Sequence, residues 1–132
     1  MAVDLRTVGT LAPPRGYSHV AVGRGGTIVF TAGAVPLDHE GRLVGEGDAL
    51  AQAGRVIENL LIQLEAGGAR PRDVAKTTVY MAGGSYDTQA AVWQILRSSA
   101  IGRAPSTLVG VPTLGYRGQL VEIEAIALVD RA

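Results

Sequence analysis

Two carboxylates stand two residues apart in the segment VEIEAIALV, near the end of this 132-residue chain. Glu122 and Glu124 alternate with aliphatic residues, so in an extended strand both carboxylates project from one face and the aliphatic side chains from the other. A carboxylate partly withdrawn from water is a suitable group for proton transfer near neutral pH. The pair could serve in this way as an acid and a base, or it could meet arginines across an interface between subunits.

A cation for an anionic substrate could come from the stretch GRAPSTLVGV, which begins at Gly102. If a strand has already begun at Arg103, positions 103 and 105 share a face about 6.6 Å apart, at about 3.3 Å per residue. An extended arginine side chain could span that distance. Pro105 fixes φ and removes an amide donor, so Arg103 could instead be a solvated loop residue. Arg117, in the loop LGYRG, is a second candidate, with a plain surface position as its alternative.

Two aromatic residues could form the walls of a pocket for a ligand. Tyr17 precedes a strand-like run and could line the pocket or pack on that run. Trp93 lies at the edge of an apolar stripe of a predicted helix, where a core or interface position is the alternative. His19 and His39 have no companion at metal-ligand spacing, and the chain has no cysteine. We therefore expect neither a metal site nor a bound cofactor.

Hydrophobic periodicity and turn residues predict two helices and about six strands. Asp48 is expected to cap a helix that runs to about Ala66, and Ser85 a second helix that runs to about Ala100. Besides a strand in the first ten residues, the predicted strands are Ser18 to Val22, Thr27 to Ala32, Val74 to Met81, Ser106 to Val111 and Gln119 to Val129. The first two of these, joined by GRGG, resemble a hairpin. We expect a single α+β domain over residues 1–132, with both helices on one face of a mixed six-stranded sheet.

Composition excludes several classes of function. Twelve basic and twelve acidic side chains give no net charge, which disfavours nucleic-acid binding. No apolar run is long enough to span a membrane, and the first residues do not have the build of a signal peptide, so we expect a cytoplasmic protein without a membrane partner. Hydrophobic residues make up 47% of the chain and charged residues only 18%. Because so short a chain has little interior, this balance predicts self-association.

Five ordered blocks resemble the RidA/YjgF family of small reactive-imine deaminases. They are Tyr17-Ser18, FTAGAVP from Phe30, VIENLLIQLEAGGA from Val56, VAKTTVY from Val74 and VEIEAIA from Val121. The resemblance implies a chorismate-mutase-like fold, and a homotrimer in which the open sheet faces line a central barrel and the ligand clefts lie between subunits. It also implies hydrolysis of imines or enamines to a keto acid and ammonia. By the resemblance, Glu122 is the proton-transferring carboxylate, and Tyr17, which lines the cleft, is the second catalytic candidate. Gly33 and Thr107 are expected to bind the substrate.

Several positions depart from the family pattern. Family members read PARST where this chain reads RAPST, so the position of the substrate-binding arginine is Pro105. Ala32 and Ala34 replace a serine and a glutamine, Ala90 replaces an asparagine of the second helix, and Trp93 replaces a nearby tyrosine. We therefore expect a less anionic, larger or aromatic substrate, with Arg103 as a possible replacement cation and Trp93, Ala32 and Pro105 in the pocket. The alternatives are a trimer that binds a small ligand or a protein without catalysis and, third, an endoribonuclease.

Overall fold

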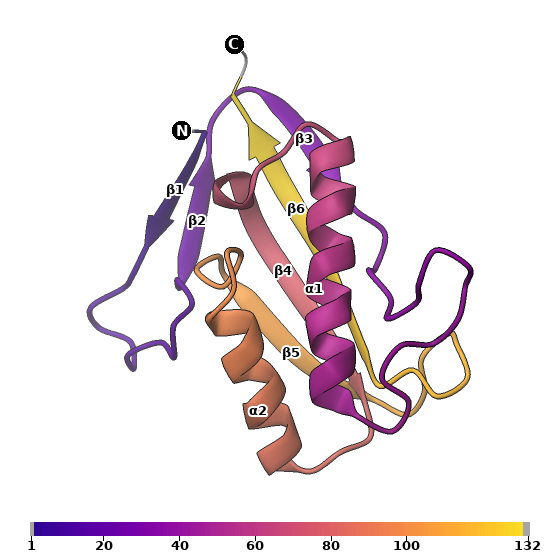
Figure 1. Cartoon of the computed structure of the whole chain (residues 1–132). Helices are drawn as coiled ribbons and strands as arrows, with labels where there is room; N and C mark the ends of the chain where they lie inside the picture. Colours follow the sequence, from indigo (N-terminus) through magenta and orange to yellow (C-terminus); the bar gives the residue numbers. More distant parts are fainter. Residues whose placement is uncertain (1, 131–132) are drawn as a thin grey trace.

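The computed structural model describes residues 2–130 of the chain (Figure 1). The strands of this part are β1 (Val3–Arg6), β2 (Val20–Gly23), β3 (Thr27–Phe30), β4 (Val74–Ala82), β5 (Ser106–Val111) and β6 (Val121–Val129). Its helices are α1 (Ala49–Ala66), the single 3-10 turn η1 (Pro71–Asp73) and α2 (Tyr86–Arg97). Apart from η1, which was not predicted, the order and type of the elements agree with those expected from the sequence.

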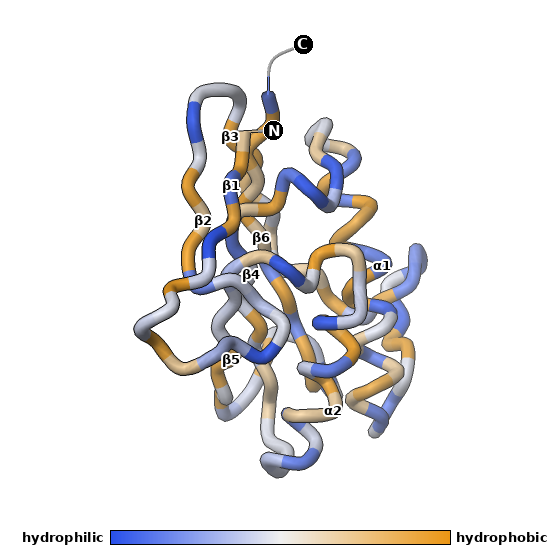
Figure 2. Tube along the Cα trace, turned by 90° about the vertical axis from the view of Figure 1, so that its left-hand side faces the viewer, coloured by the Kyte–Doolittle hydropathy of each residue, from blue (hydrophilic) through white to orange (hydrophobic). Residues whose placement is uncertain are grey.

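A four-stranded sheet in the order β3-β6-β4-β5 forms one layer, and both helices cover the same face of it (Figures 1 and 2). Strands β4 and β5 are parallel, and the other pairs are antiparallel, so the sheet is mixed as predicted. The prediction of a single six-stranded sheet is wrong in one respect. Strands β1 and β2 form a separate two-stranded antiparallel sheet.

The predicted hairpin between the second and third strands is also wrong. Strand β2 pairs with β1, whereas β3 pairs with β6 and places Val29 opposite Ala127. An isolated two-stranded hairpin is only marginally stable, and pairing with the long β6 packs Val29 against the core. Gly26 allows this path, because a Cβ there would lie 2.1 Å from the carbonyl oxygen of Val129.

Both helices begin where their capping residues predict. The Asp48 carboxylate accepts a hydrogen bond from the Ala51 amide at 3.1 Å, and the Ser85 hydroxyl accepts one from the Thr88 amide at 3.2 Å. Helix α2 ends at Arg97 rather than near Ala100. The hydroxyl of Ser99 donates to the Leu96 carbonyl at 2.6 Å, so it competes with the helical backbone bonds and turns the chain.

The core lies between the helices and the sheet. Strand β6 alternates as predicted: Val121, Ile123, Ala125 and Ala127 are buried beneath the helices. Their neighbours on β6 therefore face the uncovered side of the sheet, which we call the open face. The remaining core positions come mainly from α1, α2 and β4, and include Ala53, Val56, Leu60, Leu64, Val92, Leu96, Val79 and Met81.

Candidate functional site

The open face carries a group of polar side chains at the centre of the sheet, which we call the open-face site. It consists of Glu122 and Glu124 from β6, Lys76 and Tyr80 from β4, and Thr107 from β5. Strand register brings them together, because Tyr80 is the partner of Glu122 and Thr78 is the partner of both Glu124 and Thr107. These positions are separated widely in the sequence but are adjacent on three neighbouring strands.

Glu122 is half-buried, and the two oxygens of its carboxylate have different neighbours within the chain. Oε1 accepts a hydrogen bond of 3.0 Å from the side-chain amide of Gln119, which is only 3% exposed. Oε2 lies directly against Gly33, where an added Cβ would be 2.1 Å away. Gly33 takes this position because residues 31–34 run along β6, with the Ala34 amide donating to the Ile123 carbonyl at 2.7 Å. The glycine therefore makes room for the carboxylate.

Glu124 has a different partner. The Tyr80 hydroxyl donates a hydrogen bond of 2.5 Å to Glu124 Oε1. This hydrogen bond raises the pKa of the Tyr80 phenol, and desolvation and the negative charges of Glu124 and Glu122 raise it further. One carboxylate is thus engaged by a tyrosine and the other by a glutamine, so the two carboxylates of the predicted pair have distinct surroundings.

Lys76 supplies the cation of the open-face site. Its Nζ lies 2.8 Å from the hydroxyl oxygen of Thr107, to which it donates a hydrogen bond. Among residues 2–130, no ion pair joins Lys76 to either glutamate. The ammonium group is consequently placed to meet an anionic or strongly polar group of a ligand that lies over β4 and β5.

The structure does not bring Arg103 to this site. Strand β5 begins only at Ser106, and Arg103 lies in the preceding turn, so the condition that the strand has already begun at residue 103 is not met. The carbonyl of Arg103 accepts hydrogen bonds from the amide and the hydroxyl of Ser18, at 3.0 and 2.7 Å. Its side chain lines a pocket with Arg70 and Arg72 on the helix-covered side. Pro105, half-buried, connects that turn to β5.

Tyr17 and Trp93 do come together, but away from Glu122. Their rings contact edge to face with centroids 5.6 Å apart, and Trp93 donates its indole N–H to the Arg15 carbonyl at 3.1 Å. They line a pocket of about 770 Å³ beside α2, which also includes Ala90 and Arg97. We call this the aromatic pocket. Within one subunit, then, the two predicted catalytic residues Tyr17 and Glu122 belong to different surfaces.

The remaining candidates are dispersed. Ala32 is exposed and Ala34 is buried, both in the segment that precedes α1. Arg117 is exposed in the loop before β6 and lines a small pocket with Tyr116 and Pro112. Its loop leads into Gln119, whose side chain also accepts a hydrogen bond from the Tyr116 amide at 3.2 Å.

Sequence reasoning missed three residues of the site: Gln119, Lys76 and Tyr80. The alternation of VAKTTVYMA could have placed Lys76 and Tyr80 on the face opposite the core residues Val79 and Met81, because β4 was predicted correctly. Gln119 gave no such signal, since its importance lies in a side chain that reaches forward to Glu122.

Within residues 2–130, no cluster of three or more histidine, aspartate or glutamate side chains could hold a metal ion. None of the helices in the same part of the chain has the length and apolar character needed to cross a membrane.

Comparison with known proteins agrees with this architecture. A protein of the conserved Rid protein family, YyfB from Yersinia pestis, has a solved structure that superposes with a TM-score of 0.92 at 32% sequence identity, over 98% of this chain and 100% of that one. The class of protein is therefore the Rid fold, two helices on a mixed sheet. The sequence profile of the family described as Endoribonuclease L-PSP matches residues 8–129, and the chain belongs to this family, the RidA/YjgF family that its motifs resemble.

Two named relatives match over a shorter region. A RutC family protein of Pyrococcus abyssi is 45% identical over 56 residues, which is 42% of this chain and 44% of that protein. A 2-iminobutanoate/2-iminopropanoate deaminase of Salmonella typhimurium is 39% identical over 56 residues, 42% of this chain and 43% of that enzyme. The chain thus spans less than half the length of each of these relatives.

Proposed function

We propose that the protein is a hydrolase for small imines or enamines, acting at clefts between the subunits of a homotrimer. The observation that carries this proposal is the half-buried carboxylate of Glu122, oriented by Gln119 and packed against Gly33 on the open face. The family to which the chain belongs includes an imine deaminase, the Salmonella typhimurium relative. Residues that line the cleft without taking part in proton transfer would then decide which imine is accepted.

The proposed reaction converts an imine and water to a carbonyl compound and ammonia. Water adds to the carbon of the C=N bond, and Glu122 accepts a proton from that water. Glu122 returns this proton to the nitrogen, which gives a carbinolamine with a hydroxyl and an amino group on the same carbon. Glu122 then takes the proton of that hydroxyl and passes it to the nitrogen, so that ammonia leaves as the C–N bond breaks and the C=O bond forms. With Oε1 engaged by Gln119, the neighbouring Oε2 is the oxygen available for this transfer.

The cations near Glu122 and Glu124 indicate which class of substrate the site would accept. No arginine pairs with Glu122 or Glu124 among residues 2–130, and Pro105 stands where the resemblance expects an arginine. Lys76 can offer a single point charge but not the two parallel hydrogen bonds that a guanidinium makes to a carboxylate. We therefore propose a neutral or weakly anionic substrate. In the trimer, Tyr17 and Trp93 of a neighbouring subunit would supply an aromatic wall.

The decisive experiment measures the release of ammonia and of the carbonyl product, which is a keto acid from enzymatically generated 2-aminoacrylate and an aldehyde or ketone from an uncharged aryl imine. Native protein is compared with Glu122→Gln, Pro105→Arg and the control Glu65→Gln, a glutamate exposed on α1. We expect Glu122→Gln to lower the catalysed rate by about 10²-fold or more, because general acid–base catalysis typically contributes about that much. Glu65→Gln should match the native protein, and Pro105→Arg should raise the rate with 2-aminoacrylate relative to the aryl imine.

Equal rates for the native protein and Glu122→Gln would contradict the catalytic assignment. A second candidate function is binding of a small ligand without catalysis, favoured by Ala32, Ala34 and Ala90 at positions where the resemblance expects polar groups. It would be supported if native protein bound an imine or its keto acid but accelerated no hydrolysis above the spontaneous rate.

A further inference from the structure

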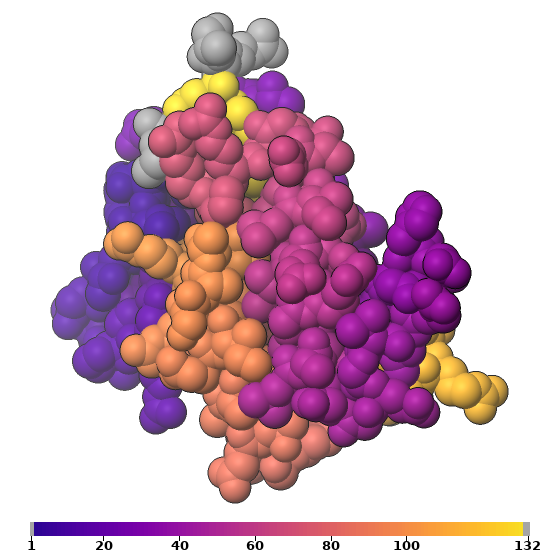
Figure 3. Space-filling view, in the orientation of Figure 1, coloured from indigo at the N-terminus to yellow at the C-terminus, as the bar shows by residue number. Residues whose placement is uncertain are grey.

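A second pocket lies on the helix-covered side of the molecule, where three segments distant in sequence adjoin. These are β1, the turn η1 and the chain that follows α2, coloured indigo, rose and orange in Figure 3. The pocket has a volume of about 560 Å³, which falls within the range of about 300–1,000 Å³ typical of small-molecule sites. We call it the arginine pocket.

The floor of the arginine pocket is apolar and its edge is basic. Val74 and Ile101, each only 2% exposed, lie in the floor. Arg70, Arg72 and Arg103 line the edge, and all three side chains are exposed. A guanidinium beside an apolar surface interacts more strongly with an anion than it would in bulk water, because less solvent screens the two charges.

The three arginines have no carboxylate partner among residues 2–130. Asp4 also lines the pocket, but its carboxylate is paired with Arg6 at 2.9 Å. The carboxylate of Asp73 accepts a hydrogen bond from the backbone amide of Arg70 at 2.8 Å and makes no ion pair with its side chain. The pocket therefore has an excess of positive charge in a chain whose formal net charge is zero.

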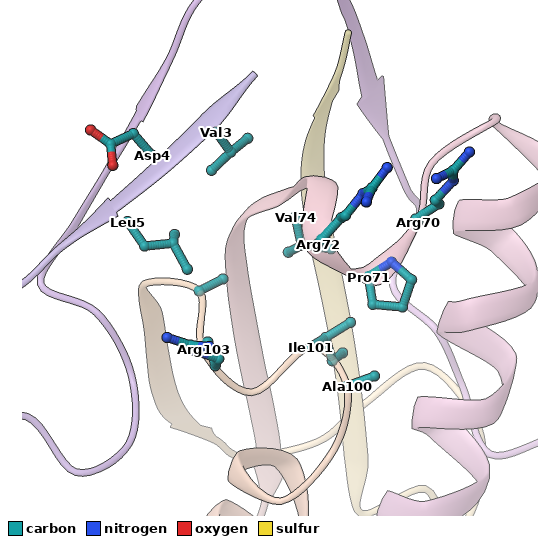
Figure 4. Close-up of a pocket in the computed structure, with 11 residues that line it drawn as sticks. Val3, Asp4, Leu5, Arg70, Pro71, Arg72, Val74, Ala100, Ile101 and Arg103 are labelled. Atoms are coloured by element: carbon teal, nitrogen blue, oxygen red, sulfur yellow. The ribbon is translucent and has the colours of Figure 1, made fainter. Parts of the chain in front are cut away.

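The arginines occupy two sides of the pocket. Figure 4 shows Arg103 close to Leu5 on one side and Arg70 and Arg72 on the other, with Val74 and Ile101 between them. Exposed arginine side chains sample several rotamers, so each can turn toward a ligand in the pocket. A ligand that matches this arrangement has an anionic group at each end and a short apolar segment in the middle.

We propose that the arginine pocket binds a small organic dianion of the dicarboxylate class. One carboxylate meets Arg103, the other meets Arg72 with Arg70, and the carbon chain covers Val74 and Ile101. This site is separate from the open-face site, because Val74 and Ile101 belong to the core side of the sheet whereas Glu122 lies on the opposite face. Binding here requires no covalent step and does not depend on the proposed hydrolysis.

The proposal is tested by isothermal titration calorimetry with adipate at low ionic strength. Hexanoate serves as the comparison ligand, because it has the same chain length with one carboxylate. The variants are Arg103→Gln and Arg72→Gln, with Arg42→Gln as the control that removes an equal charge from a loop outside the pocket. We expect saturable adipate binding that weakens with added salt, and a loss of about tenfold in affinity for hexanoate and for each pocket variant.

The variants Arg42→Gln and Glu122→Gln should bind adipate with the affinity of the native protein. Adipate binding is therefore expected whether or not the protein is a hydrolase, so the two proposals can fail independently. The absence of saturable binding for adipate, the shorter succinate and the longer suberate would overturn the inference. So would retained affinity in either pocket variant, because the two-sided arrangement requires both arginines. Weaker binding in Glu122→Gln would also overturn it, since the ligand would then occupy the open-face site.

Discussion

The hydrogen bond between Tyr80 and Glu124 on the open face makes the stability of the protein sensitive to alkaline pH. The phenol donates a hydrogen bond to the Glu124 carboxylate, and a phenolate could not make this hydrogen bond and would bring a negative charge next to that carboxylate. The hydrogen bond to Glu124 is the main reason why the pKa of Tyr80 lies above its ordinary value of 10.0, and desolvation of the phenol and repulsion by the Glu124 charge raise the pKa further. Of the groups that face Tyr80, Glu122 is also negative and acts in the same direction.

This arrangement predicts how stability changes with pH. Because the pKa of Tyr80 is raised in the folded protein, its stabilising contribution is complete below about pH 10, the unfolded value, and is lost as pH rises through the folded value. In urea unfolding, the difference in unfolding free energy between native protein and Tyr80→Phe should shrink across that interval. Tyr86→Phe, at a tyrosine that is 89% exposed, is the control and should follow the native curve. A difference that stays constant with pH would contradict the prediction.

At the scale of elements, the turn that leads into β6 fixes the catalytic candidate. Gln119 accepts a hydrogen bond from the Tyr116 amide and donates to the Val121 carbonyl and to Glu122, so one buried side chain joins the loop, the strand and the carboxylate. The sequence predicted that the strand begins at Gln119. Strand β6 instead begins at Val121, because the side chain of Gln119 makes hydrogen bonds that stabilise the turn before the strand.

The substitution Gln119→Leu tests this role of the Gln119 side chain. It leaves the Tyr116 amide without its side-chain acceptor and Glu122 without its donor, and an unsatisfied buried polar group costs about 1–3 kcal/mol. We expect the unfolding free energy to fall by that amount. If Glu122 acts as proposed, kcat should fall about tenfold or more while KM changes less, because the carboxylate is misplaced rather than removed. Unchanged stability together with unchanged kcat would show that Gln119 has neither role.

At the scale of the whole molecule, the open face is unusual for an isolated small protein. Phe30 is 72% exposed and Ile28 57% exposed on β3, and Ile126 on the adjacent β6 is 38% exposed. Apolar side chains gathered on an uncovered sheet face favour burial against another copy of the chain. The proposed homotrimer would cover them and would bring the aromatic pocket of one subunit near Glu122 of the next.

We therefore expect native protein to be trimeric by light scattering and Phe30→Glu to dissociate toward monomer, because a charge in a buried apolar contact is costly. Ile62→Glu is the matched control: Ile62 is 64% exposed on α1, on the helix-covered side, and its replacement should leave the trimer intact. A monomeric native protein, or a trimeric Phe30→Glu variant, would contradict the assembly on which the intersubunit cleft depends.

Local chemistry made much of the fold predictable. Asp48 and Ser85 marked the helix starts because a side-chain oxygen can satisfy amides of a first turn, and VEIEAIALV defined its buried face because strand side chains alternate. The motifs also identified the family correctly. The hairpin prediction failed because two short runs beside a glycine-rich turn carry no information about a longer strand almost 100 residues later.

The sequence by itself determined the elements, the amphipathic pattern of each, and the family, since all of these depend on residue type and short-range spacing. Only the tertiary structure decided which side chains meet. It placed Gly33 against Glu122 and Lys76 beside Thr107, and it brought Arg103 to the same pocket as Arg70 and Arg72. The spacing of these residues along the chain specifies none of their distances in space. Strand register and the packing of turns set those distances, because the free energy of burying one common core selects a single arrangement of the segments.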